Sequence, residues 1–223
     1  MSAMPKTGKG PSQSRAEVLA AILAHVPFEG WGETAWRKAA KDIGQPLAFV
    51  KMAFPRGARE MVEAHLKATD DAMVKALKKK NLGKMKIRER IETAVLTRLA
   101  LNGKNREAAR RTVGFLALPM NARLSAKCLW RTADAMWVAA GDTATDYNHY
   151  TKRIILSAVY SSTLLVWLND HSKGLKETRA FLARRIADVL RFEKVKGRLR
   201  EFTKDLPSPA RILGEIRYPH GHR

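Results

Sequence analysis

Side chains that perform catalysis or bind metals are present in this sequence, but not at the spacings that such sites need. A di-iron helical bundle requires a Glu-x-x-His pair on each of two helices, whereas the sequence holds no Glu-x-x-His and a single Asp146-x-x-His149 pair. It also lacks the Gly-x-Ser-x-Gly, His-Glu-x-x-His and phosphate-loop patterns. His171, His220 and His222 fall in an expected loop and an expected tail. We therefore predict no intrinsic catalysis, no cofactor and no bound metal.

The charge of the chain is strongly positive and unevenly distributed. The 223 residues include 42 Lys and Arg against 21 Asp and Glu, which gives a net charge of +21. This charge favours nucleic acid, an anionic membrane surface or an acidic partner, and does not by itself choose among them. Residues 128–172 carry 3 basic and 4 acidic side chains, so this window has no excess positive charge. The single cysteine, Cys128, excludes an intramolecular disulfide and suits a reducing compartment.

Apolar side chains repeat with the period of a helix along almost the whole chain. Val18, Ile22 and Val26 share one face of a first helix, which Pro27 is expected to end. No stretch alternates with a period of two between turn residues, so we predict an all-α protein. Further helices are expected at 33–43, 47–54, 58–80, 87–102, 105–115, 121–140, 147–171 and 176–206.

The early helices have the order of a helix-turn-helix unit. Residues 33–43 and 47–54 are joined by a tight turn at Gly44, Gln45 and Pro46, and a long helix follows. This order resembles the amino-terminal part of TetR-type regulators, in which the unit precedes a larger all-α ligand-binding and dimerisation domain. A recognition helix needs polar side chains that reach phosphates and base edges, and residues 47–54 offer only Lys51. We therefore predict a structural unit that does not read DNA, with a TetR-type ligand-responsive repressor as the alternative.

A second joint between helices lies in the window without excess positive charge. Gly141 is expected to end one helix, and Thr143 or Thr145 to cap the next. Asp142 and Asp146 bring negative charge to the start of that next helix, where the helix dipole favours it. Beyond the joint, the helix is apolar nearly all round, so it must be covered on every side, as a central helix or a dimer seam.

The residues of this joint form a motif that continues into the next helix. They read Ala140-Gly-Asp-x-x-Thr-Asp-Tyr-Asn-x-Tyr-Thr-Lys-Arg153, followed by Val159-Tyr-x-x-Thr163 and then Asp170-x-Ser172. This motif resembles the hallmark of the COQ9 family of ubiquinone biosynthesis proteins. The resemblance runs through roughly the last hundred residues, and elements at 26–31 and 54–57 are similar to the family as well.

The resemblance implies a TetR-like homodimer that does not bind DNA specifically. An apolar pocket would hold an isoprenoid lipid, and the protein would present this quinone precursor at the membrane to the di-iron demethoxyubiquinone hydroxylase. The implied partners are the lipid, the hydroxylase, an anionic membrane surface and a second copy of the chain. The implied location is cytoplasmic and peripheral to the inner membrane in a bacterium, or on the matrix side of that membrane in a mitochondrion.

The resemblance also implies a partner-binding patch and a membrane-binding segment. The patch comprises Asp142, Asp146, His149 and Tyr150. His149 stands where many members of the family carry Trp, so the patch lacks one large aromatic anchor. A short basic amphipathic segment near the end either lies in a membrane interface or packs back on the domain. Its residues are Arg211, Ile212, Leu213, Ile216 and Arg217.

Long apolar side chains of the larger domain are the candidate walls of the lipid pocket. Each of them, taken singly, also fits an ordinary core position. They are Leu96, Leu99, Leu116, Leu118, Leu129, Met136, Trp137, Val159, Tyr160, Leu164 and Trp167. The predicted organisation is a disordered basic tail at 1–14, a helix-turn-helix-like unit at 15–65, an all-α lipid-binding and dimerisation domain at 66–206, and an amphipathic segment at 207–223.

Overall fold

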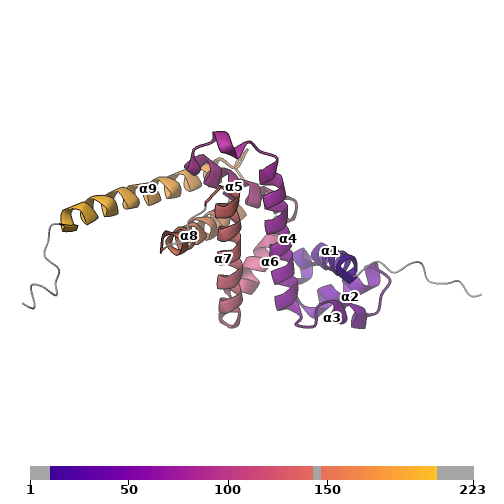
Figure 1. The fold of residues 1–223 in the computed structure, drawn as a ribbon. Helices are drawn as coiled ribbons and strands as arrows, with labels where there is room; N and C mark the ends of the chain where they lie inside the picture. Colours follow the sequence, from indigo (N-terminus) through magenta and orange to yellow (C-terminus); the bar gives the residue numbers. More distant parts are fainter. Residues whose placement is uncertain (1–10, 143–146, 205–223) are drawn as a thin grey trace, which may run out of the picture. The chain divides into compact units, whose positions relative to one another are not determined.

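A computed structural model describes residues 11–142 and 147–204, and these residues are almost entirely helical (Figure 1). No strand occurs among them, which confirms the all-α prediction. The α-helices are α1 Pro11–Glu29, α2 Glu33–Asp42, α3 Leu47–Ala53, α4 Ala58–Lys78, α5 Ile87–Leu101, α6 Arg106–Ala117, α7 Ala122–Ala139, α8 Tyr147–Asn169 and α9 Lys176–Lys204. Short 3-10 turns lie at η1 Leu82–Lys84, η2 Gly103–Asn105 and η3 Pro119–Asn121.

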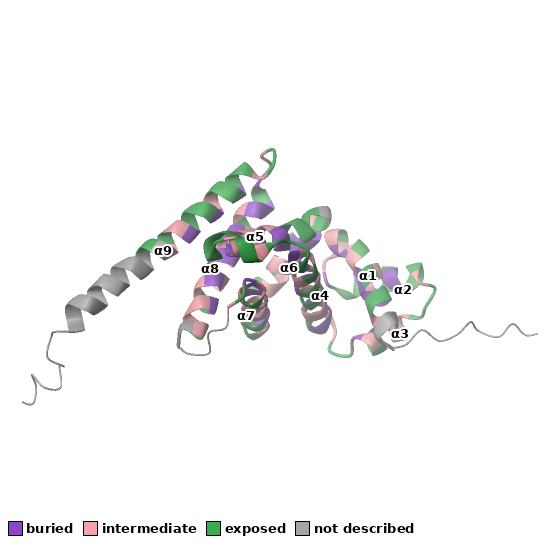
Figure 2. Cartoon of the chain, turned by 45° about the horizontal axis from the view of Figure 1, so that its top comes forward, coloured by how far each residue is buried: buried purple, intermediate pink, exposed green. Residues whose placement is uncertain are grey.

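The chain divides into two compact units, Met1–Leu182 and Ala183–Arg223. The first unit contains α1 to α8 and the start of α9, and the second contains the rest of α9. Along the helices of the first unit, buried residues alternate with exposed ones at helical spacing, as they do in amphipathic helices (Figure 2).

The first three helices share a core with α4 and α6. Ile22 of α1, Val50 of α3 and Met61 of α4 have no exposed surface and belong to one hydrophobic cluster, which also contains Ala108 of α6. The indole Nε1 of Trp31 donates a 3.1 Å hydrogen bond to Thr112 Oγ1 on α6. The helix-turn-helix unit is therefore packed on the larger helical part through both apolar and polar contacts.

Pro27 does not end α1, contrary to the prediction. The helix continues to Glu29, and its end is marked by Gly30, whose φ is +69°. The amide of Gly30 donates to the carbonyl oxygen of Val26 at 2.9 Å. A proline in the last turn of a helix removes one N–H donor but does not stop the residues after it from adopting helical geometry. The helix therefore ends at the glycine, which adopts the left-handed conformation.

Gly57 precedes the first residue of α4 and has a backbone conformation that favours glycine. Its φ is +65°, and a Cβ at this position would lie 3.1 Å from a ring atom of Trp36. Phe54, three residues earlier, is buried in the core cluster. A larger residue than glycine would be strained in this conformation and would press on the Trp36 ring.

The helix in the position of a recognition helix presents few polar groups. In α3, Val50 is buried, while Lys51 and Met52 are exposed. The ammonium of Lys51 lies 3.7 Å from the carboxylate of Glu33 on α2. The lone basic side chain of this helix is therefore paired within the unit itself.

The joint after α7 has the geometry expected from its glycine. Gly141 has φ +88°, and its amide donates to Val138 O at 3.0 Å. The amide of Asp142 donates to Trp137 O at 3.0 Å, which completes a Schellman motif. Arg90 of α5 fastens this end, because its Nη1 donates to Ala140 O at 2.9 Å.

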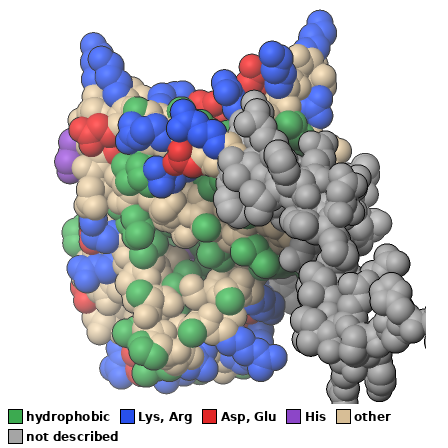
Figure 3. Space-filling view, turned by 90° about the vertical axis from the view of Figure 1, so that its left-hand side faces the viewer, with side chains coloured by type: hydrophobic (Ala, Val, Ile, Leu, Met, Phe, Trp, Pro, Cys, Tyr) green, Lys and Arg blue, Asp and Glu red, His purple; other side chains and the backbone are tan. Residues whose placement is uncertain are grey.

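Large apolar side chains remain exposed on α7 and α8. Val138, Ile154 and Leu165 each keep more than half of their surface exposed. On the face shown in Figure 3, hydrophobic side chains gather in the middle, with Lys and Arg mostly above and below them. This face of the described residues is thus partly apolar on a chain that is strongly basic overall.

Candidate functional site

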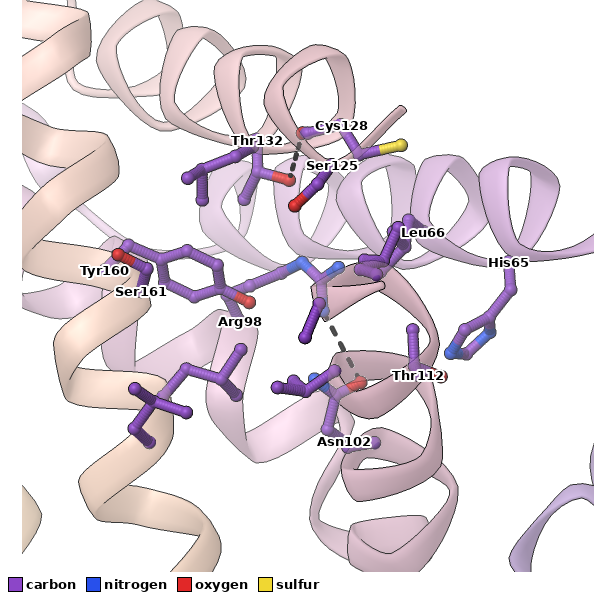
Figure 4. Close-up of a pocket in the computed structure, with 17 residues that line it drawn as sticks. His65, Leu66, Arg98, Asn102, Thr112, Ser125, Cys128, Thr132, Tyr160 and Ser161 are labelled. Atoms are coloured by element: carbon purple, nitrogen blue, oxygen red, sulfur yellow. Dashed lines mark hydrogen bonds between the residues drawn. The ribbon is translucent and has the colours of Figure 1, made fainter. Parts of the chain in front are cut away.

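A cavity of about 300 Å³ lies among α4, α5, α6, α7 and α8 (Figure 4). Its lining is mostly apolar, as expected for a site that holds a hydrophobic ligand. The larger apolar side chains of the lining are Leu66, Val113, Leu116, Leu129, Leu164 and Leu165. All five helices contribute residues, so the cavity depends on how the larger helical part is assembled.

The structure brings some of the predicted lipid-binding residues to this cavity and leaves others elsewhere. Those that line the cavity are Leu116, Leu129, Tyr160 and Leu164. Those that are buried outside the lining are Leu99, Met136, Val159 and Trp167. Leu96 and Trp137 are half-buried, and Leu118 is exposed at the end of α6.

Specific contacts hold the two tryptophans of that set away from the lining. Trp137 Nε1 donates to Lys152 O at 3.0 Å, and Trp167 lies under the guanidinium of Arg106, whose Cζ is 4.8 Å from the ring centroid. These side chains therefore connect helices, a role that helical spacing alone does not distinguish from that of a pocket wall.

None of the polar residues of the lining other than Tyr160 was predicted from the sequence, and His65, Arg98 and Asn102 are among those missed. A signal for one of them exists in the sequence. Arg98 follows Ile91 and Val95 at helical spacing, so a charged residue sits within the apolar stripe of α5. A charge in such a position is almost never fully buried unless it is paired.

Asp70 of α4 pairs Arg98 and joins three of the helices around the cavity. Its Oδ1 accepts hydrogen bonds from Arg98 Nε at 2.9 Å and from Thr132 Oγ1 at 3.0 Å, and its Oδ2 accepts one from Arg131 Nε at 3.1 Å. Arg98 has no exposed surface, and Asp70 is 3% exposed. Because Arg98 lies on α5 and the other two donors on α7, the carboxylate fixes these cavity walls relative to one another.

The titratable side chains of the lining are held in uncharged forms, apart from Arg98. Burial, reinforced by the positive charge of Arg98, lowers the pKa of His65 to about 4, so this imidazole is neutral near pH 7. Burial also raises the pKa of the Tyr160 phenol, against the opposing effect of Arg98. The cavity lining contains no carboxylate. It therefore offers one buried cation within otherwise neutral walls.

The predicted partner-binding patch contains an aromatic cluster at the start of α8. The ring centroids of His149 and Tyr150 are 5.2 Å apart, and that of Trp130 on α7 lies 5.9 Å from Tyr150. Tyr150 is 58% exposed. Trp130 was not among the predicted patch residues. It lies on α7, the helix before the joint, and no spacing in the sequence connects it to His149. Asp146 lies outside the described residues.

Asp142 has a structural position in this region. Its side chain is 6% exposed, and its carboxylate accepts hydrogen bonds from Lys152 Nζ at 2.6 Å and Arg153 Nη1 at 3.2 Å. Arg153 is itself 2% exposed, and also donates to Asp134 Oδ1 at 2.6 Å and to His149 O at 3.1 Å. The buried guanidinium thus ties the end of α7 to the first turn of α8, where His149 and Tyr150 are presented.

The predicted membrane segment, with Arg211, Ile212, Leu213, Ile216 and Arg217, lies outside the described residues. Within 11–142 and 147–204, none of the helices combines the length and the hydrophobicity that crossing a bilayer requires.

Comparisons with known proteins bear on the fold and on the family. The crystal structure of a TetR transcriptional regulator from Nitrosomonas europaea matches this chain with a TM-score of 0.65 at 18% identity, covering 78% of this chain and 97% of that one. This likeness confirms the TetR-like fold. The COQ9 family model matches residues 122–193, which span α7, the joint, α8 and the first part of α9.

Two curated relatives extend the match over most of the chain. The mitochondrial ubiquinone biosynthesis protein COQ9 of Homo sapiens is 31% identical over 185 residues, covering 80% of this chain and 58% of that protein. COQ9-B of Xenopus laevis is 32% identical over 185 residues, covering 80% and 63%. This chain therefore spans about three fifths of the length of these relatives. Together with the motif at 140–153, these matches show that the chain is similar in sequence to the COQ9 family.

Proposed function

We propose that this protein is a lipid-binding accessory protein of ubiquinone biosynthesis. It binds an isoprenoid quinone precursor and presents it at the membrane to the di-iron hydroxylase of the pathway. The observation that carries the proposal is the apolar cavity of about 300 Å³ among α4 to α8, found in a chain whose relatives are named ubiquinone biosynthesis proteins. The free energy falls when an isoprenoid tail leaves water and packs against the apolar walls of such a cavity.

The chemistry of the cavity supports binding rather than catalysis. A hydrolytic or acid–base site needs a nucleophile or a base with a partner that orients it. His65 contacts the ring of Trp31, with the centroids 5.8 Å apart, and the lining supplies no carboxylate to orient it. The guanidinium of Arg98 offers hydrogen-bond donors and no acceptor, so it can hold a ligand. The role that follows is to hold a ligand for another protein.

The arrangement of α8 supports presentation to a partner. Its first turn carries His149 and the exposed Tyr150, and its middle carries the cavity residues Tyr160 and Leu164. Ten residues of helix separate the two tyrosines, a rise of about 15 Å. A hydroxylase that binds at Trp130, His149 and Tyr150 would therefore lie about 15 Å along α8 from the ligand.

The surface charge and the exposed apolar face support the remaining associations. Val138 and Ile154 are available for a second copy of the chain, which we expect to form a homodimer through α7 and α8. The net charge of +21 favours an anionic membrane surface at the location expected for the family. No observation favours a repressor, because α3 lacks the donors that base readout requires.

Complementation of a strain that lacks this gene tests the proposal. Ubiquinone is expected to fall in the deletion strain, and the substrate of the hydroxylase to accumulate. A Leu129→Trp variant, which fills the cavity, should restore ubiquinone poorly, because the indole occupies the space of the lipid. Ala126→Trp adds the same side chain at an exposed position of the same helix and should restore it fully. Both lipids are measured by mass spectrometry, and normal ubiquinone in the deletion strain would contradict the proposal.

A further inference from the structure

One nitrogen of the cavity's buried arginine has no hydrogen-bond partner among the described residues. Arg98 Nε donates to Asp70, and Nη1 makes a long contact of 3.4 Å with Asn102 Oδ1. Nη2 is fully buried and donates to nothing described. A buried guanidinium N–H without an acceptor has lost its hydration without gaining a protein hydrogen bond, and this cost is larger for a charged group than for a neutral one. Such a group calls for an explanation beyond the packing of the fold.

The guanidinium lies where a ligand in the cavity would meet it. Figure 4 shows it reaching between the lining side chains, with the ring of Tyr160 directed towards it from one side and Asn102 lying on another. Leu116, Leu129 and Leu164 line the same space. An apolar chain that follows these leucines would therefore bring its end group close to Nη2.

The charges around Arg98 leave room for a further acceptor. Asp70 is shared between Arg98 and Arg131, so one buried carboxylate serves two cations. Glu63 lies 4.0 Å from Arg131 and is also bonded to Lys127 at 2.6 Å, so its charge is directed away from the cavity. Hydrogen bonds to an ionised donor are roughly twice as strong as neutral ones. An acceptor supplied by a ligand would complete the coordination of this guanidinium.

We propose that Arg98 Nη2 anchors a hydrogen-bond-accepting oxygen on the head group of the lipid in this cavity. The cavity therefore selects an amphiphile, with an isoprenoid tail against the leucines and an oxygen-bearing head at Arg98, over a hydrocarbon of the same size. The inference rests on the proposed function and adds to it the chemistry of the head group. Two kinds of head share this chemistry: a neutral ring with carbonyl or hydroxyl oxygens, and an anionic carboxylate.

Three ligands with one geranyl tail separate these possibilities. One carries a dimethoxy-methyl-benzoquinone head, one ends in a carboxylate (geranic acid), and one carries an unsubstituted phenyl ring without an acceptor. Each is bound to the delipidated full chain, and its affinity is measured by displacement of a fluorescent fatty-acid probe. Affinities are compared between wild type and Arg98→Met for each ligand, so differences in ligand solubility cancel.

Arg98→Met should weaken binding of the quinone or of geranic acid by about tenfold or more, and leave the phenyl ligand within about twofold. If Arg98→Met weakens the binding of the quinone alone, the head group that Arg98 binds is neutral. If it weakens the binding of geranic acid, that head group is anionic. The matched control is Arg131→Met. Arg131 also pairs with Asp70 but does not line the cavity, so this variant should keep the wild-type order of affinities for the three ligands.

Folding is checked by circular dichroism, and Arg98→Lys gives a second variant that keeps the positive charge at Asp70 but lacks the Nη2 donor. It should show the same selective loss. If the ratio of wild-type to variant affinity were the same for all three ligands, the head-group inference would be overturned and the proposed function would stand. Failure of the wild type to bind any of the three would overturn both.

Discussion

Asp70→Asn should lower the free energy of unfolding by about 3–5 kcal/mol, the range found when one partner of a buried charged pair is removed. The amide keeps the shape of the side chain but loses the charge that Arg98 and Arg131 share. Arg98 has no exposed surface, so water cannot replace the lost carboxylate. Chemical denaturation followed by tryptophan fluorescence measures the change.

The neighbouring residue supplies the control. Asp71 is exposed and pairs with Lys67 one turn earlier, at 3.3 Å. Asp71→Asn removes the same charge from the same helix and should change the unfolding free energy by no more than about 0.5 kcal/mol. Similar effects of the two substitutions would show that the buried cluster does not hold α4, α5 and α7 together.

Arg153→Met should lower the unfolding free energy by about 2–4 kcal/mol, since it removes hydrogen bonds to two carboxylates and a carbonyl. It should also weaken binding to the pathway's hydroxylase, because the first turn of α8 loses its tie to the end of α7. Denaturation gives the first effect, and the affinity of the purified hydroxylase for the variant gives the second.

Lys152 is a matched control one residue away. It pairs with the same Asp142, but its side chain is 38% exposed. Lys152→Met should therefore change stability by about 1 kcal/mol or less. If hydroxylase binding survived in Arg153→Met at a temperature where the variant is folded, the proposed role of the α7–α8 joint in presentation would be wrong.

The fold was predictable because its main signals are local. Helical spacing of apolar residues located α2 to α9, and Gly141 marked the end of α7 through the left-handed conformation that glycine adopts readily. Pro27 misled the prediction, because a proline near the end of a helix is tolerated when the glycine three residues later makes the turn. The joint motif at 140–153 likewise indicated a similarity to the COQ9 family from a short stretch, and the model of that family matches residues 122–193.

The cavity was less predictable, since its walls come from five helices far apart in the sequence. Leu99 and Leu129 are alike in the sequence, yet only Leu129 faces the cavity. Periodicity indicates which face of a helix is buried, but not whether that face meets another side chain or an open space. Asp142 shows the same limit, because a carboxylate expected at a docking surface is engaged by Lys152 and Arg153.

Native mass spectrometry of the gently purified chain, followed by lipid extraction, would show whether this protein carries a lipid. It reports the number of copies in the assembly and the identity of the bound lipid in one measurement. We expect a dimer that carries an isoprenoid lipid with an oxygen-bearing head. A protein that carries no lipid, and that takes up none when prenylated quinones are added, would contradict this expectation.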